Sequence, residues 1–474
     1  MARTFLNAIF VAWRSGEIAL RFSPLILLVP AAILSAATDG LDGKKSRVSD
    51  WAWNYSLYTI QTLGPAFVKI CQWGATRRDL FPAHVCDRLS KLHDATFQHS
   101  WKHTHEILSK AFGEDYGTVG GLTIDQNDVI GSGSVAQVYK GTLNRNGVEK
   151  MVAVKILHPN IHGRIERDLS LMQRVASLVD SLPSETIRMM NLPRVAANFS
   201  DIMRHQIDLR NEKAHLERFR DNFLCDDALV GKVSFPQPIF AEADCLVEDY
   251  EDAVPISQFL KDDSPSGMAL RRRLAGPLLR AFLKMVFMDN FVHSDLHQGN
   301  VQVRKTSVPI APLGITRSDN GDTKHYDDKY TIVFLDAGIV TTLSKEDQQN
   351  LKDLFKAVIM NNGEEAGRLM VERAKYERCS QVEGGIEKFS IGVGEIVSEF
   401  HDRRKQGLTL GVVRIGTLLS KVLDLCRIHA VEIDPAMSNI VMSTLVLEGL
   451  GRSLDEDLNL FDIAIPFVLG RGKV

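Results

Sequence analysis

The stretch FVHSDLHQGNVQV, residues 291–303, decides the fold of this chain. It follows a helix predicted over residues 271–289 and contains the polar run HSDLHQGN at 293–300. The carboxylate of Asp295 can orient or deprotonate a hydroxyl group, and the amide oxygen of Asn300 can bind Mg²⁺. A plain loop rarely carries these side chains directly after an apolar helix. The stretch therefore predicts a site that activates a hydroxyl group beside a metal ion.

A second motif, DAG at 336–338, follows an apolar strand predicted over residues 332–335. The two motifs parallel H-R-D-L-x-x-x-N and D-F-G of protein kinases, in which the second aspartate binds the metal ion that bridges the β- and γ-phosphates. D-A-G by itself is a common turn, but its position after Asn300 gives it weight. Magnesium prefers one or two carboxylates together with phosphate oxygens. We therefore predict Asn300 and Asp336 as metal ligands and Asp295 as a catalytic residue.

Upstream, VIGSGSVAQVYKGTL (129–143) and MVAVKIL (151–157) predict a hairpin and a third strand, joined by a polar turn at 144–147. The hairpin matches the glycine-rich loop G-x-G-x-x-G-x-V, except that Ala136 replaces the third glycine. Glycines let backbone amides approach phosphate oxygens, although a G-x-G turn is more often simple turn chemistry. The predicted nucleotide-binding residues of this loop are Gly131, Ser132, Gly133, Ser134 and Val138.

Lys155 ends the pattern VAVK on the third strand, where an ammonium group would reach the α- and β-phosphates. A lysine on an edge strand is the ordinary alternative. Its predicted partner is Glu212 in QIDLRNEKAHLERF (206–219), where a solvated helix glutamate is the alternative. We count Lys155 and Glu212 with Asp295 as the catalytic residues. Glu248, in the buried strand predicted at CLVEDY (245–250), is a further candidate for nucleotide binding.

These five motifs occur in the order of a protein kinase, each on the expected type of element. They predict an α+β, two-lobe protein-kinase-like fold, with a mixed small lobe containing an antiparallel sheet and a largely helical C-terminal lobe. The predicted segments are a targeting or membrane-proximal region at 1–50, a helical extension at 51–122, an N-lobe at 123–252 and a C-lobe at 253–474. The expected cofactors are ATP and Mg²⁺.

Composition excludes some partners and leaves the amino terminus open. A net charge of -3 lacks the basic excess of a nucleic-acid-binding protein, and the 6 cysteines form no C-x-x-C pair. Arg3, Arg14 and Arg21 oppose the single acid Glu17 before an uncharged stretch at 22–38. That stretch is shorter than the roughly 20 residues that span a bilayer and contains two prolines. A membrane segment, a mitochondrial transit region and a buried helix all fit it.

Taken together, the motifs resemble the UbiB/ABC1/AarF-domain family of atypical kinases, with similarity from residue 51 to residue 469. The resemblance implies ATPase or small-molecule phosphotransfer activity that supports coenzyme Q (ubiquinone) biosynthesis or mitochondrial lipid metabolism. It also implies association with the mitochondrial inner membrane and partners among lipid or quinone-pathway components. The matching stretches are LGPAFVKICQWGATRRDLFP, GSGSVAQVYKG, VAVKILHP, QIDLRNE, DNFVHSDLHQGN, LDAGIV and LVLEGLGRSLD.

In this family a K-x-G-Q motif folds across the site and limits access by peptides. The matching residues are Lys69 and Gln72, which the resemblance makes nucleotide-site residues, while Cys71 replaces the glycine. A second departure is Gln206, which replaces the first acid of an E-x-D motif and removes an expected ion-pair partner of Lys69. No A-P-E segment follows Asp336, so the motifs do not imply protein phosphorylation.

Three functions remain open at this point. The first is an active ATP-dependent kinase or ATPase, for which every required group is present. The second is a nucleotide-gated scaffold with little catalysis, which the altered K-x-G-Q and E-x-D positions favour. The third is a soluble small-molecule kinase of the aminoglycoside or choline type, against which the amino-terminal extension argues.

Overall fold

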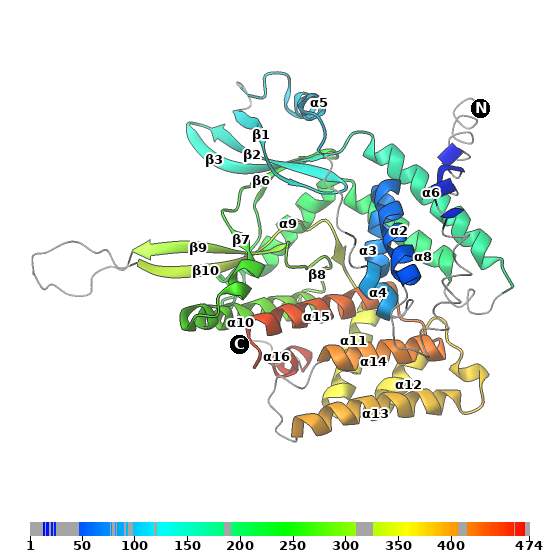
Figure 1. The fold of residues 1–474 in the computed structure, drawn as a ribbon. Helices are drawn as coiled ribbons and strands as arrows, with labels where there is room; N and C mark the ends of the chain where they lie inside the picture. Colours follow the sequence, from blue (N-terminus) through cyan, green and yellow to red (C-terminus); the bar gives the residue numbers. More distant parts are fainter. Residues whose placement is uncertain are drawn as a thin grey trace, which may run out of the picture. The chain divides into compact units, whose positions relative to one another are not determined.

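The computed structural model describes residues 13–14, 16–18, 20–21, 23–24, 47–75, 77, 81, 83–89, 92, 98–117, 121–183, 191–309, 326–405, 415–458 and 460–469. Figure 1 shows the course of the chain through these residues. The chain divides into two compact units. The first comprises Met1–Asn144, Val154–Asp208 and Ala243–Cys245, and the second comprises Arg145–Ala153, Leu209–Glu242 and Leu246–Val474. The predicted segment boundaries at 50, 122 and 252 stay predictions.

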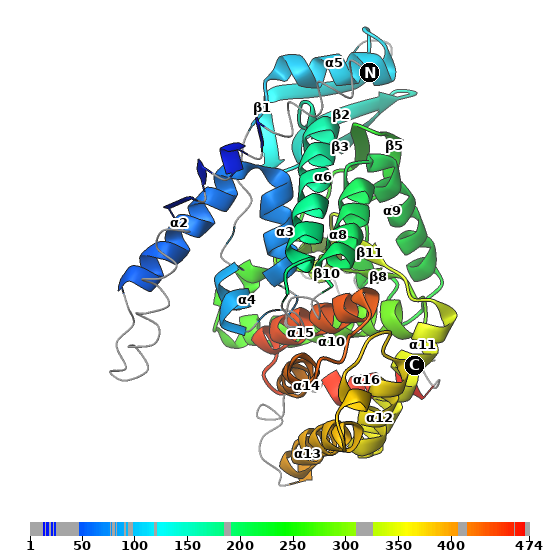
Figure 2. The same cartoon turned by 90° about the vertical axis from the view of Figure 1, so that its right-hand side faces the viewer.

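The first unit is rich in helices, and a glycine followed by a proline separates two helices of the extension predicted at 51–122. Gly64 has a φ of 121°, and Pro65 lacks the amide hydrogen that a continuing helix would need. α6 and α8 pack along each other, as Figure 2 shows. The helices of this unit are α2 (Arg47–Leu63), α3 (Pro65–Ala75), α4 (Ala83–Leu89), α5 (Trp101–Phe112), α6 (Ile161–Asp180) and α8 (Leu192–Gln206).

A small apolar cluster packs α2 and α3 together. Ile60, Val68 and Leu92 are buried at its centre, and Cys71 packs against them. Burial raises the pKa of the Cys71 thiol to about 12, so the side chain stays protonated at neutral pH. The cysteine that replaces the glycine of the K-x-G-Q motif therefore serves as an apolar packing residue.

A five-stranded sheet contains the predicted glycine-rich loop. Its strand order is β1 (Leu122–Ser132), β2 (Ala136–Arg145), β3 (Val148–Leu157), β6 (Cys245–Asp249) and β5 (Pro238–Glu242), and the division between the units runs through β3 and β6. β1 and β2 are antiparallel, with Gly131 opposite Val138. Asn146 and Gly147 connect β2 to β3 with φ angles of 55° and 79°, as a two-residue hairpin turn with two left-handed positions requires. The predicted antiparallel sheet is confirmed.

The second unit begins with α9 (Leu209–Leu224) and contains a second sheet in the order β4 (Val233–Ser234), β10 (Tyr326–Phe334), β9 (Val301–Pro309) and β7 (Val254–Pro255). β9 and β10 form a long antiparallel hairpin, visible at the left of Figure 1. These strands include residues 307–309 and 326–329, and residues 310–325 lie outside the described part. β8 (Val292–His293) pairs with β11 (Val340–Thr341), so the two motif loops flank one short ladder.

The rest of the second unit is helical, as predicted for the C-terminal lobe. Ser344 caps the start of α11, because its hydroxyl oxygen accepts a hydrogen bond from the Asp347 amide at 3.0 Å. The helices are η1 (Ile256–Lys261), α10 (Pro265–Phe287), α11 (Lys345–Ile359), α12 (Gly363–Arg373), η2 (Cys379–Gln381), α13 (Gly385–Lys405), α14 (Ile415–His429), α15 (Pro435–Leu454) and α16 (Leu460–Val468).

No helix among the described residues is long and apolar enough to cross a membrane. The uncharged stretch predicted at 22–38 lies outside the described residues, apart from residues 23 and 24.

The contact between α12 and α13 leaves no room for a side chain at Gly367. A β-carbon placed there would lie 2.7 Å from the Ser390 Cα and 3.1 Å from the Val393 Cβ. We expect Gly367→Ala to lower the free energy of unfolding by about 1–3 kcal/mol, because the two helices must move apart. Chemical denaturation measures the change.

Gly449→Ala in α15 is the matched control, since a β-carbon there meets nothing within 4 Å. It should leave the free energy of unfolding unchanged or raise it by up to about 1 kcal/mol, because alanine favours the helix. Equal effects of the two substitutions would contradict a close helix contact at Gly367.

Candidate active site

Buried His293 connects the 293–300 loop to the strand that precedes Asp336. Its Nε2 donates a hydrogen bond to the Leu335 carbonyl at 3.0 Å, and its Nδ1 accepts one from the Asp295 amide at 3.3 Å. Burial lowers the pKa of His293, and a neutral ring suits one donating and one accepting nitrogen. The histidine therefore fixes the backbone on both sides of the predicted catalytic aspartate.

Asn300 and the D-A-G segment are held together through Leu335. The Asn300 Nδ2 donates to the Asp295 carbonyl at 2.9 Å, while the Leu335 amide donates to the Asn300 carbonyl at 2.9 Å. Leu335 is the residue before Asp336, so the backbones of the two predicted metal ligands lie side by side. The structure thus brings Asp295, Asn300 and Asp336 into one part of the second unit.

Asp336 has a left-handed backbone, with a φ of 53°. This conformation is uncommon for a residue other than glycine, and such residues cluster at functional sites. Its carboxylate Oδ1 accepts a hydrogen bond from the Gly338 amide at 3.3 Å. A β-carbon on Gly338 would lie 3.1 Å from the same oxygen, which explains the glycine of the motif.

Helix α9 carries Glu212 and contacts the D-A-G segment directly. The Glu212 side chain is only 4% exposed, which excludes the solvated helix glutamate considered from the sequence. One turn later, the His215 Nδ1 donates a hydrogen bond to the Ala337 carbonyl at 2.8 Å. Sequence reasoning missed His215, although its spacing of three residues from Glu212 places both on one helix face.

Aromatic rings continue the link between α9 and the 293–300 loop. The Phe219 ring lies with its centroid 4.6 Å from Phe291 and 6.0 Å from His293. The Arg218 guanidinium lies 4.0 Å from the centre of the Phe291 ring, within the range of a cation–π interaction. α9, the loop and the D-A-G segment consequently form one packed group.

The first unit contains the glycine-rich loop, and His158 at the end of β3 holds its backbone. The His158 Nε2 donates to the Gly133 carbonyl at 2.9 Å, and the His158 amide donates to the Val135 carbonyl at 2.9 Å. The Gly133 amide closes the loop by donating to the Ala136 carbonyl at 2.9 Å. His158 was not among the predicted site residues, although it lies only three residues after Lys155.

A chain of hydrogen bonds, in which each donor can be assigned, holds the His158 ring on the side away from the loop. Because Nε2 of His158 donates, its Nδ1 must accept from the Nδ1 of His99, 2.8 Å away. The Nε2 of His99 then accepts from the Thr104 hydroxyl, which accepts from the Tyr139 hydroxyl; both contacts are 2.9 Å. Gln137 closes the circuit, since its amide group donates to the Tyr139 oxygen at 2.8 Å and accepts from the His99 amide at 2.9 Å.

This arrangement requires both imidazoles to be neutral. Burial, followed by the neighbouring His158 and His103, lowers the pKa of His99 to about 4. Burial also lowers the pKa of His158. A proton added to either ring would place two donors against each other, so acid should weaken the support of the loop.

The remaining predicted residues are divided between the units. Lys155 lies half-buried on β3 in the first unit, whereas Glu212 and Glu248 belong to the second unit. The Lys155–Glu212 pairing stays a prediction. Lys69 and Gln72 lie on α3, where the Gln72 amide donates to the Leu92 carbonyl at 3.2 Å. Their approach to the nucleotide also stays a prediction.

The His99 circuit predicts a specific pH dependence of stability. Between the ordinary histidine pKa of 6.5 and the folded value of about 4, the unfolded chain binds more protons than the folded chain. The free energy of unfolding should therefore fall as the pH decreases through this window. His99→Asn removes the titrating ring, so the stability advantage of the wild type over this variant should shrink between pH of about 7 and about 5. Urea denaturation at each pH measures it.

His84→Asn removes an exposed histidine of the same unit and serves as the control. It should keep the pH dependence of the wild type. A constant difference between wild type and His99→Asn across this range would rule out a neutral His99.

Comparison with known proteins shows which family the chain resembles. Residues 91–370, more than half of the chain, match the ABC1 atypical kinase-like domain. An ABC1 family protein of Schizosaccharomyces pombe, described as mitochondrial, is 32% identical over 508 residues, which cover 96% of this chain and 70% of that protein. A probable protein kinase UbiB of Histophilus somni is 27% identical over 413 residues, which cover 86% of this chain and 69% of that protein.

A solved structure agrees with the fold. The complex of Rv3197 with erythromycin from Mycobacterium tuberculosis superposes with a TM-score of 0.50 at 14% identity, over 91% of this chain and 94% of that chain. The predicted α+β kinase-like fold is confirmed, and so is the predicted family. This chain belongs to the ABC1 family of atypical kinase-like proteins.

Proposed function

We propose that this chain is an atypical ATP-dependent kinase or ATPase that works with Mg²⁺. The observation that carries the proposal is the hydrogen-bonded unit of the 293–300 loop and the D-A-G segment, in which Leu335 joins the backbones of Asn300 and Asp336. Phosphoryl transfer depends mainly on positioning and charge neutralisation. The loop and the D-A-G segment would position the reactants, while Lys155 and a bound Mg²⁺ would supply the positive charge.

Each predicted residue has a role in this proposal. Lys155 binds the α- and β-phosphates, and buried Glu212 orients its ammonium group. The amides of residues 131–134 approach the phosphates, with Val138 and Glu248 beside the rest of the nucleotide. Asp295 accepts the proton of the attacking hydroxyl group or water. The neutral His293 keeps the Asp295 backbone in place while this proton moves.

The side chains at 300 and 336 suit a magnesium ion. An amide oxygen and a carboxylate are hard oxygen ligands, and Mg²⁺ completes its shell with phosphate oxygens and water. Among the described residues, no group of three or more His, Cys, Asp or Glu could hold a metal ion by itself. A site made of Asn300, Asp336 and nucleotide phosphates is consistent with this finding. When bound, the ion would neutralise the negative charge that develops on the phosphates.

We further propose that the activity supports coenzyme Q biosynthesis or mitochondrial lipid metabolism, at the mitochondrial inner membrane. The family resemblance implies this role, and the Schizosaccharomyces pombe relative is described as mitochondrial. Lys69 and Gln72 on α3 would limit access by peptides. A lipid or quinone-pathway component, or water, is therefore preferred over a protein as the acceptor.

Two substitutions separate binding from chemistry. Asp336→Asn should weaken Mg-ATP binding about tenfold or more, since it removes the charged metal ligand. Asp295→Asn should keep Mg-ATP affinity within about threefold while it lowers the turnover by about a hundredfold, since it removes only the proton acceptor. Calorimetric titration with Mg-ATP and measurement of phosphate release test both.

Asp227→Asn, at an exposed position in the same unit, should behave as the wild type in both assays. Unchanged binding and hydrolysis in Asp336→Asn would overturn the metal assignment. Full rescue of a deletion strain by the Asp295→Asn variant would favour a scaffold over an enzyme.

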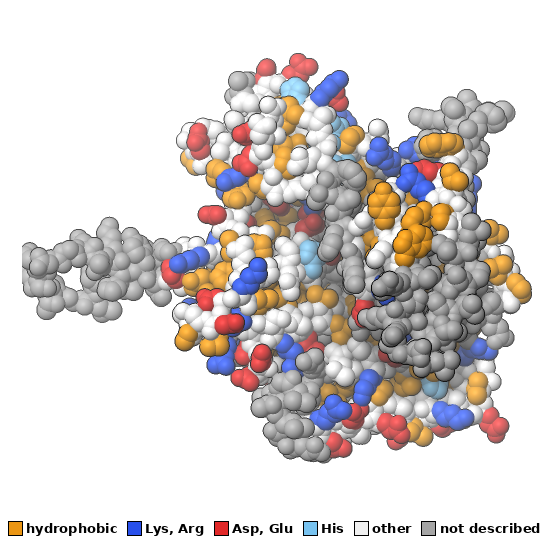
Figure 3. Space-filling view, in the orientation of Figure 1, with side chains coloured by type: hydrophobic (Ala, Val, Ile, Leu, Met, Phe, Trp, Pro, Cys, Tyr) orange, Lys and Arg blue, Asp and Glu red, His pale blue; other side chains and the backbone are white. Residues whose placement is uncertain are grey.

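Exposed aromatic side chains on α2 support membrane association. Trp51 is 48% exposed and Tyr58 is 64% exposed, and Figure 3 shows hydrophobic side chains gathered over the stretch where α2 lies. Tryptophan and tyrosine side chains favour a membrane surface, where the ring enters the apolar layer and the polar group stays in water.

A Trp51→Ser, Tyr58→Ser variant should bind vesicles of phosphatidylcholine and cardiolipin about fivefold or more weakly, because it removes two interfacial rings. Co-sedimentation measures the binding. Leu224→Ser with Ile428→Ser, at exposed apolar positions of the second unit, is the control and should bind as the wild type. Loss of binding only on deletion of residues 1–38 would instead assign the contact to that segment.

A further inference from the structure

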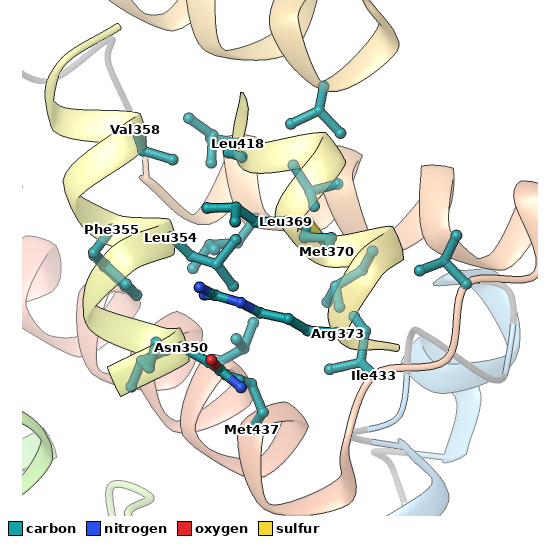
Figure 4. Close-up of a pocket in the computed structure, with 18 of the residues that line it drawn as sticks. Asn350, Leu354, Phe355, Val358, Leu369, Met370, Arg373, Leu418, Ile433 and Met437 are labelled. Atoms are coloured by element: carbon teal, nitrogen blue, oxygen red, sulfur yellow. The ribbon is translucent and has the colours of Figure 1, made fainter. Parts of the chain in front are cut away.

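An apolar cavity lies among the C-terminal helices of the second unit, and no predicted site residue lines it. Its volume is about 150 Å³, and the lining comes from α11, α12, α13, α14, α15 and α16 together with the segment before α15. Figure 4 shows Leu354, Leu369 and Leu418 directed into it from three of these helices. The cavity is partly open to solvent, so a small molecule can enter it.

The chemistry of the lining favours an apolar occupant over water. An ordered water needs two to four polar partners, and a mostly apolar wall supplies few of them. Apolar lining with a few polar groups is typical of sites that bind small organic ligands. Most of the wall here is formed by leucine, valine, phenylalanine and methionine side chains. The cavity is therefore suited to a ring or a short hydrocarbon chain.

Arg373 introduces a basic group into this wall, which also carries three acidic side chains, Asp347, Glu432 and Asp434. The Asp434 carboxylate accepts a hydrogen bond from the Lys375 Nζ at 3.0 Å. Figure 4 shows the Arg373 side chain extending from the end of α12 across the cavity, with Asn350 of α11 beside it. The guanidinium Nη2 donates to the Asp353 carboxylate at 3.0 Å. A guanidinium has five N–H donors, and one carboxylate leaves donors that can bind a further oxygen. The cavity thus combines an apolar interior with hydrogen-bond donors for a head group.

We propose that this cavity binds a medium-chain amphiphile with a carboxylate head group. The hydrocarbon chain lies among Leu354, Leu369 and Leu418, and the carboxylate accepts hydrogen bonds from Arg373 and Asn350. This site is separate from the residues that bind the nucleotide in the proposed function. It gives the chain a binding site for an acyl compound that does not require ATP.

Sodium decanoate, below its micelle concentration, is the probe, and titration calorimetry on the full chain is the measurement. The wild type should bind it saturably at one site. Leu369→Trp should weaken binding about tenfold or more, because the indole fills the cavity. Ile391→Trp, at a half-exposed position of α13 outside the cavity wall, should bind as the wild type.

Arg373→Met tests the head group. It should weaken decanoate about tenfold, since a charge-assisted hydrogen bond is lost, and 1-decanol by no more than about twofold. Equal losses for the two probes would overturn the assignment of Arg373.

Circular dichroism and melting confirm that each variant is folded, and Met370→Phe provides a second filling substitution should Leu369→Trp be unstable. Absence of saturable decanoate binding, or wild-type affinity in both folded filling variants, would overturn the proposal. Mg-ATP affinity, measured on the same samples, should not change. A wild-type chain that does not bind Mg-ATP would count against the proposed enzymatic function. The decanoate result would still hold, because the two sites are separate.

Discussion

The hydrogen bonds between the 293–300 loop and Leu335 are the constraint on which the candidate site depends. Leu335 accepts from His293 and donates to Asn300, so the two motif loops cannot move independently. His215 extends the same network to α9 through the Ala337 carbonyl. A buried, neutral imidazole serves this purpose well, because it offers one donor and one acceptor without the cost of burying a charge. The position of α9, and with it Glu212, is consequently tied to the backbone beside Asp336.

The glycine-rich loop is stabilised by a different network. Hydrogen bonds run from the Gly133 carbonyl through His158 and His99 to side chains of α5 and β2. His158 donates to the Gly133 carbonyl, which leaves its Nδ1 to accept from His99. Such a network is rigid only when it is fully satisfied. The glycine-rich loop therefore gains a defined backbone position from His158 and His99, which are distant from it in sequence.

The C-terminal helices are packed very closely at one place and leave a cavity at another. At Gly367, α12 and α13 approach so closely that one added carbon has no space. Directly beside this contact, the same helices line an apolar cavity with Arg373 at its wall. The second unit thus contains the kinase-like motifs and, apart from them, the apolar pocket for which we propose an amphiphile.

The amino-acid sequence by itself determined the family, the α+β fold and the motif residues Asp295, Asn300 and Asp336. These are local properties, since each motif requires certain residue types at short, fixed spacings. Tertiary structure decided that Glu212 is buried, that Cys71 packs in an apolar cluster, and that His215, His158 and His99 support the site. These contacts join residues distant in the chain, and a lone histidine or cysteine has no periodicity that reveals its partner. The cavity at Arg373 has the same origin, because its lining is brought together only by the packing of six helices.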